Sequence, residues 1–314
     1  MRTPNVFAGP YLDRAAHLRK DTAYVAAALA DPGTLIAPLW RARNLVQPAG
    51  HAFGAAFVDV RHEIRASLDE GEFILLGQFH GRACFAVDLP AEAAPMAPPG
   101  AAFEDLRRTG GQLPEDEAGL LAYARAMVLW RQRHRHCGTC GAPTRSRNAG
   151  HVMQCSRAEC GAEHFPRLDP AIIVLVTDGE RALLGRQAAW PPGRYSTIAG
   201  FVEPGESLED AVAREVLEET GVTIVDAEYH SSQPWPFPSS LMIGFTATAA
   251  ADSRPRADEE LEDVRWFTRD QIASGEPRLP PRQSVSLRLI EHWYDSGSRV
   301  PLRETPGWAS QGWG

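Results

Sequence analysis

The first third of the chain carries short apolar runs separated by turn residues. Residues 72–76 and 83–88 are mostly apolar, and Gly81 lies in the stretch between them. Runs of this length are typical of buried strands. Residues 91–100 contain four alanines and three prolines, which predicts a loop. This part of the chain is therefore expected to be a mixed domain with strands.

Three later segments repeat apolar residues at helical spacing. The first is Glu117 to Trp130, with Pro114 near its start, and the second is residues 207–219, closed by Gly221 in the position of a C-cap. The third, residues 285–294, reads as a final amphipathic helix. Strands are predicted at residues 171–176, 183–185, 241–248 and 264–267. No internal repeat of a solenoid period is present.

The composition is that of an ordinary globular protein, with 314 residues, 44% hydrophobic and 23% charged. The length suggests about two domains, and a net charge of -8 argues against a protein that coats DNA. The longest aliphatic run is residues 171–176, far short of the roughly 20 residues that span a bilayer. The N-terminus carries charges and prolines where a signal peptide would be apolar. We therefore expect a cytoplasmic protein without a membrane segment.

Four of the five cysteines form two close pairs. Cys137 and Cys140 are a CxxC motif, and Cys155 and Cys160 follow with four residues between them. Two such turns can direct four thiolates at one tetrahedral zinc ion, and four protein ligands make that zinc structural rather than catalytic. Free buried cysteines or a redox CxxC are the alternatives. Cys84 lies alone in an apolar run and is expected in a core.

Arginines surround the cysteine pairs. Such cationic side chains are what an RNA-binding ribbon would carry, and a solvated face is an equally good interpretation. The arginines are Arg131, Arg133, Arg135, Arg145 and Arg147.

Carboxylates gather on one face of the helix predicted at residues 207–219. Glu215, Glu218 and Glu219 stand at i, i+3 and i+4, Glu206 precedes them, and Arg214 is one cation among them. Oxygen ligands of this kind suit Mg²⁺ or Mn²⁺, which can bridge carboxylates to substrate phosphates. A solvated acidic face is the alternative.

The acidic balance of the chain is concentrated rather than diffuse. Residues 203–219 have a net charge of -6 and residues 258–263 a net charge of -5, so the remainder of the chain is net +3. Two short segments therefore carry the whole acidic excess of the chain.

The glutamate-rich stretch resembles the Nudix box, whose pattern spaces a glycine, a glutamate, an Arg-Glu pair, a Glu-Glu pair and a final glycine. All fixed positions are filled, by Gly200, Glu206, Arg214, Glu215, Val216, Glu218, Glu219, Gly221 and Val222. The resemblance implies an α/β/α sandwich and metal-dependent hydrolysis of a nucleoside diphosphate linked to another moiety.

The same resemblance implies roles for single residues. Glu215 and Glu219 would bind the divalent metal, with Glu218 close by and the Ala199 carbonyl as a further ligand. Arg214 would orient the glutamates, and Glu206 would pair with it or support the loop. Glu260 matches the late metal-binding glutamate of the family, although it could belong to an acidic surface turn. Glu219 is the first candidate for a general base and Glu260 the second.

Residues 232–240, SQPWPFPSS, alternate three prolines with two aromatic residues. The pattern predicts a stiff loop that presents Trp235 and Phe237, and a loop pinned by core aromatics is the alternative. The segment resembles the signature of the NADH pyrophosphatases, a Nudix subfamily that also carries cysteine pairs before the Nudix domain. The resemblance covers roughly residues 130–293.

This closer resemblance implies hydrolysis of NADH, and more weakly NAD⁺, to nicotinamide mononucleotide and AMP, or removal of NAD caps from RNA 5′ ends. Phe201 would stack on the nicotinamide, Phe165 would lie near the adenine, and the backbone of Ser286 would contact substrate. The pocket would be lined by Gln233, Pro234, Trp235, Pro236, Phe237, Pro238, Ser239 and Ser240. ADP-ribose hydrolysis, or a zinc-ribbon nucleic-acid binder without catalysis, are the alternatives.

Three parts are therefore expected. They are an N-terminal α+β domain at residues 1–130, a zinc ribbon at 131–167 and a Nudix domain with an α/β/α sandwich at 168–314. The resemblance also implies a homodimer. The chain departs from the subfamily in its longer second cysteine pair, in Gly150 where some members have an acidic residue, and in Ser239 where some have glutamine.

Overall fold

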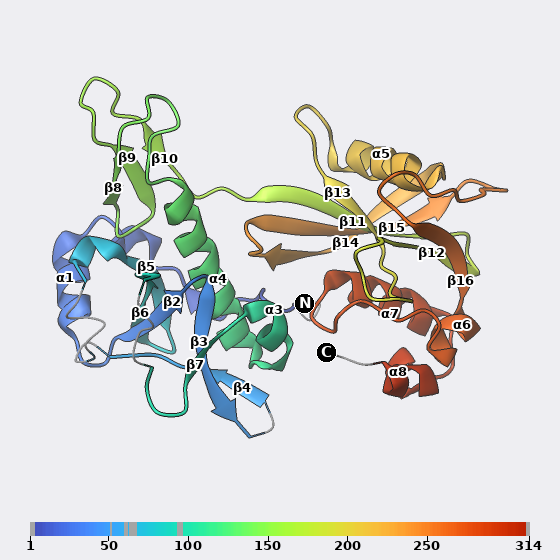
Figure 1. Ribbon diagram of the computed structural model, residues 1–314, viewed down its shortest axis with the longest axis horizontal. Coiled ribbons are helices and arrows are strands. Elements are labelled where there is room, and N and C mark those ends of the chain that lie inside the picture. Colours follow the sequence, from blue (N-terminus) through green and yellow to red (C-terminus); the bar gives the residue numbers. More distant parts are fainter. Residues whose placement is uncertain (1–3, 51, 60–61, 63–67, 93–96, 312–314) are drawn as a thin grey trace. The chain divides into compact units, whose positions relative to one another are not determined.

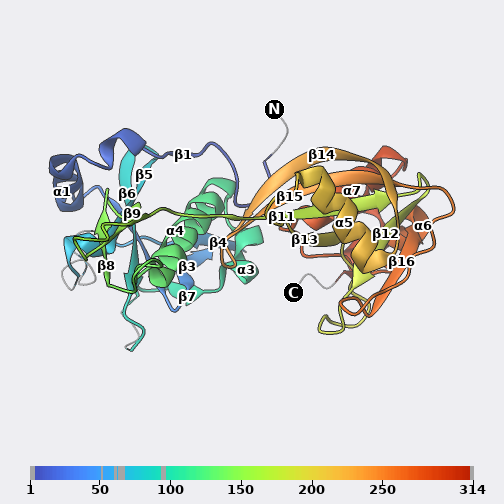
Figure 2. The same cartoon turned by 90° about the horizontal axis from the view of Figure 1, so that it is seen from above.

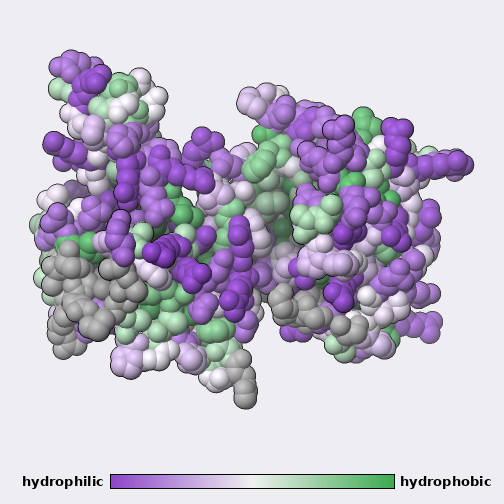
Figure 3. Space-filling view, in the orientation of Figure 1, coloured by the Kyte–Doolittle hydropathy of each residue, from purple (hydrophilic) through white to green (hydrophobic). Residues whose placement is uncertain are grey.

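A computed structural model describes residues 4–50, 52–59, 62, 68–92 and 97–311, which form two compact units. Unit 1 holds Met1–Leu168 and Pro234–Ser239, and unit 2 holds Asp169–Gln233 and Ser240–Gly314. On the face drawn in Figure 3, hydrophilic residues predominate on both units. Among the described residues, no helix is long and apolar enough to cross a membrane.

Unit 1 is built on a seven-stranded sheet of order β1-β5-β6-β2-β3-β4, with β7 paired to β3. The 19-residue helix α4 (Glu115–Arg133) lies across this sheet in Figure 1 and buries Leu121, Ala124 and Val128 in its core. The strands are β1 (Leu12–Asp13), β2 (Leu35–Trp40), β3 (Arg43–Ala49), β4 (Ala52–Ala55), β5 (Phe73–Phe79), β6 (Arg82–Leu89) and β7 (Ala102–Glu104). The shorter helices are α1 (Thr22–Ala30) and α3 (Leu106–Thr109), with 3-10 turns η1 (Ala16–Leu18), η2 (Glu70–Glu72) and η3 (Gly110–Gln112).

Two boundaries in unit 1 refine the sequence analysis. The strand expected from residue 72 begins at Phe73, because Glu70–Glu72 form the turn η2. The helix expected at residues 117–130 starts two residues earlier and ends three residues later. Cys84 is fully buried in the core of the sheet, as predicted.

The cysteine region forms a small three-stranded antiparallel sheet of its own, in the order β10-β9-β8. The strands are β8 (Thr144–Arg147), β9 (Val152–Cys155) and β10 (Glu163–His164). Cys137 and Cys140 lie in the turn before β8, Cys155 ends β9, and Cys160 lies in the turn between β9 and β10. This is the ribbon architecture that the sequence indicated.

Unit 2 is a six-stranded mixed sheet in the order β14-β15-β11-β12-β16, with β13 paired to β11. Its central strand β11 alternates its side chains between two cores. Ile172 and Val174 pack with residues of α5, whereas Ile173 and Leu175 pack with residues of α7, as side chains with a period of two must. Figure 2 shows the same arrangement from above. Helices therefore cover both faces, and the predicted α/β/α sandwich is confirmed.

The expected strands and helices of unit 2 are present. The strands are β11 (Asp169–Thr177), β12 (Arg181–Arg186), β13 (Ile198–Phe201), β14 (Ile224–Trp235), β15 (Ser240–Ala249) and β16 (Asp263–Thr268). The helices are α5 (Leu208–Thr220), α6 (Arg269–Ser274), α7 (Val285–Ser296) and α8 (Pro306–Ser310), with the turn η4 (Leu302–Glu304). The helix expected to be the last, α7, is followed by α8, a five-residue helix with Pro306 in its first turn. A helix this short gives little periodic signal.

Candidate active site

Helix α5 (Leu208–Thr220) lies within one residue of its predicted range, 207–219, at each end. The Ser207 hydroxyl accepts from the Asp210 N–H at 3.1 Å, and the Asp210 carboxylate accepts in return from the Ser207 N–H, which makes a capping box. Gly221 closes the helix with a left-handed φ of 67°. These local signals set the register of the helix and so the positions of its glutamates.

Arg214 lies at the centre of a carboxylate cluster. Its Nε and Nη2 donate to the two oxygens of Glu206 at 2.6 and 2.9 Å, a bidentate pair. Its Nη1 donates to Glu215 at 2.8 Å and to Glu218 at 3.0 Å. The hydrogen bonds from Arg214 hold the pKa of Glu206 down at about 2. One guanidinium thus ties the loop before α5 to two of the helix glutamates.

Glu219 differs from the other box glutamates because it is buried, with 7% of its surface exposed. Burial, together with the neighbouring carboxylates of Glu215, Glu260 and Asp258, raises the pKa of Glu219 to about 8. The site therefore concentrates negative charge around a carboxyl group that is costly to ionise. A divalent cation would offset that cost, so this donor set suits Mg²⁺ or Mn²⁺.

Strand β13 brings three further predicted residues to this cluster. Ala199, Gly200 and Phe201 pair with Ile173, Ile172 and Ala171 of β11. The Phe201 carbonyl accepts from Arg214 Nη2 at 2.9 Å, while its ring is 59% exposed. The backbone of β13 is therefore held to the box, and an aromatic face is left open beside it.

Glu260 lies in an exposed turn. The Asp258 carboxylate accepts from the N–H groups of Glu260 and Leu261 at 2.8 and 3.2 Å, which shapes this turn. Glu260 is close enough to Glu219 to affect its pKa. In the part of the chain that the structure describes, however, only the cysteines bring three or more candidate ligand atoms within 4.8 Å of one another.

The four paired cysteines do converge on one point. Cys137 and Cys160 have their sulfurs 3.8 Å apart, and those of Cys140 and Cys155 are 3.5 Å apart. Zinc–sulfur bonds of about 2.3 Å in a tetrahedron place sulfurs about 3.8 Å apart, so the cluster fits zinc. A hydrogen bond from His164 to the Cys137 sulfur lowers the pKa of that thiol to about 5, which favours the thiolate that zinc requires.

The proline-aromatic segment packs within unit 1. The rings of Trp235 and Phe237 contact Phe7 edge to face at centroid distances of 6.1 and 6.0 Å. Arg125 Nε donates to the Pro236 carbonyl at 2.9 Å, and Arg107 stacks on the Phe237 ring at 4.7 Å. Both aromatic side chains are half-buried. The loop is thus anchored by aromatic packing while part of each ring remains accessible.

The sequence analysis did not single out Phe7, Arg107 or Arg125. A signal for Arg125 was present, because it stands four residues after Leu121 on the apolar face of α4. A charged side chain at such a position is expected to be buried and to need a hydrogen-bond acceptor or an ion-pair partner. No comparable signal marked Phe7 or Arg107.

Two predicted pocket residues use their side chains inside unit 2. The Gln233 amide donates to the Gln283 carbonyl at 2.6 Å and accepts from the Val285 N–H at 2.8 Å, at the start of α7. The Ser286 hydroxyl accepts from the Thr197 N–H at 3.2 Å and is buried. These two side chains position backbone segments.

The other predicted pocket residues, apart from the buried Pro236, are more accessible. Pro234, Pro238 and Ser239 are half-buried in unit 1, and Ser240 begins β15 in unit 2. Phe165 belongs to unit 1 and is 60% exposed. Its ring is free to contact a planar ligand.

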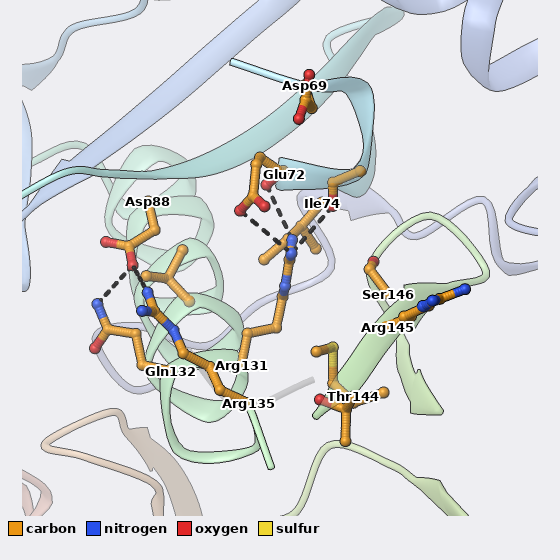
Figure 4. A pocket seen from close by; sticks show the side chains of 13 residues that line it. Asp69, Glu72, Ile74, Asp88, Arg131, Gln132, Arg135, Thr144, Arg145 and Ser146 are labelled. Atoms are coloured by element: carbon orange, nitrogen blue, oxygen red, sulfur yellow. Dashed lines mark hydrogen bonds and ion pairs between the residues drawn. The ribbon is translucent and has the colours of Figure 1, made fainter. Parts of the chain in front are cut away.

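A cavity of about 600 Å³ in unit 1 is lined by three of the ribbon's arginines, Arg131, Arg135 and Arg145 (Figure 4). Arg131 points to η2, where it donates to the carbonyls of Gly71 and Glu72 at 3.0 and 2.9 Å. Arg135 forms an ion pair with Asp88 at 3.6 Å. Arg131 therefore has a structural role. Of the five arginines that the sequence analysis named, Arg133, Arg145 and Arg147 are the other exposed ones.

Comparison with known proteins matches all three parts of the chain. Residues 167–290 match the NUDIX domain, residues 33–130 the NADH pyrophosphatase-like rudimentary NUDIX domain, and residues 132–165 the NADH pyrophosphatase zinc ribbon domain.

Similar proteins include two whose names describe them as NAD-capped RNA hydrolases. NudC of Stutzerimonas stutzeri (strain A1501) is 43% identical over 272 residues, which is 84% of this chain and 92% of that protein. NUDT12 of Homo sapiens is 42% identical over 197 residues, 58% of this chain and 43% of that protein, so the match spans less than half of NUDT12. A NUDIX hydrolase structure from Nitrosomonas europaea, 22% identical, covers 52% of this chain and 92% of its own at a TM-score of 0.45.

Proposed function

Because the chain belongs to the Nudix hydrolases, with the zinc ribbon and rudimentary N-terminal domain of the NADH pyrophosphatases, we propose that it hydrolyses the pyrophosphate bond of NADH. The products are reduced nicotinamide mononucleotide and AMP, and NAD⁺ is a weaker substrate. The observation that carries the proposal is the box itself, in which Arg214 gathers Glu206, Glu215 and Glu218 beside the buried Glu219.

The residues that would hold Mg²⁺ or Mn²⁺ are Glu215, Glu219, Glu260 and the Ala199 carbonyl. A divalent ion bound there supplies Lewis acidity toward phosphoryl oxygens and lowers the pKa of bound water. Arg214 holds the carboxylates of Glu215 and Glu218 in place. Glu219 is the proposed acceptor of the water proton, and Glu260 is the second candidate.

The substrate would be recognised by exposed aromatic side chains. Phe201 offers an exposed face for the nicotinamide and Phe165 one for the adenine. The segment from Gln233 to Ser240 would line the pocket, and the backbone at Ser286 would contact the substrate. The half-buried rings of Trp235 and Phe237 support this assignment, because packing pre-organises them at little entropic cost.

The test is a comparison of substrates with Mg²⁺ or Mn²⁺ present. NADH, NAD⁺ and ADP-ribose are incubated with the protein, and the products are separated by chromatography. We expect the highest kcat/KM for NADH, with nicotinamide mononucleotide and AMP in equal amounts. Much faster turnover of ADP-ribose would show that the subfamily's substrate has been wrongly assigned to this chain.

A second substrate, NAD-capped RNA, is favoured by the charge of the ribbon and by the names of the relatives. Residues 131–167 carry seven arginines and two glutamates, a net charge of +5 in a chain of net charge -8. Arg145 and Arg147 are exposed at alternate positions of β8, so they project from one face of that strand. Such a face can bind the phosphates of an RNA chain attached to the cap.

One assay distinguishes the proposal for NAD-capped RNA from the proposal for NADH. A variant with Arg145→Gln and Arg147→Gln should hydrolyse NADH normally and lose about tenfold in kcat/KM on NAD-capped RNA at low salt. The loss should shrink as salt rises. Equal rates on capped RNA for the variant and the wild type would show that these two arginines of the ribbon do not bind the RNA.

We also propose a homodimer in the cytoplasm. Val225 and Tyr229 are exposed apolar residues on β14, an edge strand of the unit 2 sheet, and such surfaces are commonly covered by a second subunit. A reducing compartment keeps the four cysteines available for zinc. The molar mass measured by light scattering tests the dimer, since a monomeric mass at micromolar concentration contradicts it.

A further inference from the structure

The segment Pro234–Ser239 has few backbone groups with which to hold its shape. Pro234, Pro236 and Pro238 have no N–H, so the segment cannot form a continuous strand ladder. The Phe237 N–H is used locally, because it donates to the Trp235 carbonyl at 2.7 Å. Beyond the pairing of β14 with β15 at its two ends, the conformation of the segment therefore depends on side chains that contact it.

Arg125 makes two contacts with this segment at once. Its Nε donates to the Pro236 carbonyl at 2.9 Å, and its guanidinium carbon lies 5.0 Å from the centroid of the Phe237 ring. Phe7 packs edge to face on the same ring, and Arg107 stacks on it. Helix α4 thus reaches the segment through one arginine side chain.

Burying Arg125 is costly. The residue is only 8% exposed, and its Nη1 is buried without a hydrogen-bond partner among the described residues. No ion pair to Arg125 is present among them either. A buried donor without a partner lowers stability, and an apolar side chain of similar volume would avoid the loss. Stability of the α4 packing therefore does not explain an arginine here.

We propose that Arg125 is a positioning residue for substrate binding, because it holds Pro236 and Phe237 in the conformation in which the segment lines the substrate pocket. This inference rests on the proposed function, which places Gln233–Ser240 in that pocket. Arg125 acts through the segment and does not itself contact the reacting atoms.

The two contacts explain why arginine is required. A planar guanidinium can donate from Nε in its own plane and present its face to a ring, whereas the ammonium of lysine is a point charge that cannot do both. Arg125→Lys should therefore behave like Arg125→Met, although it keeps the charge. Charge alone would instead predict that lysine restores the wild-type properties.

The test compares kcat and KM of the Arg125→Met and Arg125→Lys proteins with those of the wild type. We expect KM for NADH to rise about tenfold, the scale of one lost hydrogen bond, while kcat stays within about twofold. Unchanged KM in both variants would overturn the inference, as would wild-type KM in Arg125→Lys. If the wild type prefers ADP-ribose, the proposed NADH specificity fails, and the same comparison on ADP-ribose still decides the role of Arg125.

Arg131→Met is the matched control. Arg131 lies on the same helix and also donates to backbone carbonyls, those of Gly71 and Glu72. Its loss should lower Tm without changing KM. If Arg131→Met raised KM as much as Arg125→Met does, the rise in KM would come from general destabilisation of α4, and the inference would be contradicted.

A double-mutant cycle with Phe237→Leu tests whether Arg125 acts through the segment. If it does, Arg125→Met should raise KM much less in the Phe237→Leu background than in the wild type. Additive effects of the two changes would show that Arg125 influences KM by another route.

Discussion

Gly200 and Glu215 are in direct contact, since a Cβ atom at position 200 would lie 1.9 Å from the carboxylate carbon of Glu215. The backbone of β13 and the Glu215 side chain of α5 can approach this closely only when residue 200 has no side chain. This contact therefore explains why the first position of the Nudix box is a glycine in this chain. The glycine provides the space in which the Glu215 carboxylate lies.

Replacing Gly200 with alanine should displace Glu215 without unfolding unit 2. The atoms that must move are at the end of a flexible side chain, so the fold can accommodate the methyl group. A displacement of about 1 Å at a catalytic group can cost about 100-fold in rate. We expect a loss of that size in kcat for NADH, with circular dichroism unchanged.

Gly71→Ala is the control for this substitution, because an added Cβ there meets no atom within 4 Å. Its kcat should equal that of the wild type. Full activity in Gly200→Ala would show that the position of Glu215 is not important for catalysis.

The features that the sequence predicted well depend on residues close together in the chain. The capping box of Ser207 and Asp210, the left-handed Gly221 and the face shared by Glu215 and Glu219 are all set by helical spacing. The cysteine cluster is similar, since the members of each pair are only three and five positions apart in the chain. Such local patterns determine their own geometry once the helix or turn forms.

Removing Arg214 should destabilise the metal-free protein more than the metal-bound protein. In Arg214→Gln, the carboxylates of Glu206, Glu215 and Glu218 lose the cation between them. We expect Tm in EDTA to fall by roughly 2–4 °C, and millimolar Mg²⁺ to recover part of the loss. The measurement is thermal unfolding of both proteins in the two buffers. An equal difference in EDTA and in Mg²⁺ would mean that the metal and the arginine do not stabilise the same carboxylates.

His151 should make unit 1 sensitive to acid. Burial lowers its pKa to about 4, although its Nε2 donates to the Leu75 carbonyl. The unfolded chain therefore binds a proton at His151 that the folded chain does not, so stability is present above about pH 6.5 and is lost as the pH falls toward 4. The loss should reach about 3 kcal/mol at the lower limit.

Urea unfolding of the wild type and His151→Gln between pH 7 and 4 tests this expectation. Both proteins retain the four cysteines, so any loss of zinc at low pH affects them alike. The wild type should show the steeper decline. Identical pH profiles would indicate that His151 is protonated in the folded protein.

Zinc should divide the five thiols into two groups. Cys84 is fully buried, and burial raises its pKa, so it should stay unreactive toward a thiol reagent until the chain unfolds. Removal of one zinc ion per chain should expose four reactive thiols and lower Tm. The thiols are counted with a chromogenic disulfide reagent, before and after chelation. Cys84→Ala should keep its zinc and Cys155→Ser should lose it, and the reverse pattern would refute the ligand assignment.

The parts that the sequence did not predict depend on contacts between distant segments. Alternating prolines and aromatics mark residues 234–238 as a stiff loop, but nothing local indicates that Phe7 and Arg125 contact it. The side chain of Gln233 likewise falls within a recognised motif, yet it caps the start of α7. A motif identifies the residues of a site, and tertiary packing decides which of them face a ligand.

The most direct test of the account is the rate of NADH hydrolysis by Glu219→Gln with saturating Mg²⁺. Glutamine keeps the size of this buried side chain and removes the carboxylate that would bind the metal. The account predicts AMP and reduced nicotinamide mononucleotide from the wild type, and a fall in kcat of at least about 100-fold in a variant that is still folded. Wild-type turnover by Glu219→Gln would contradict it.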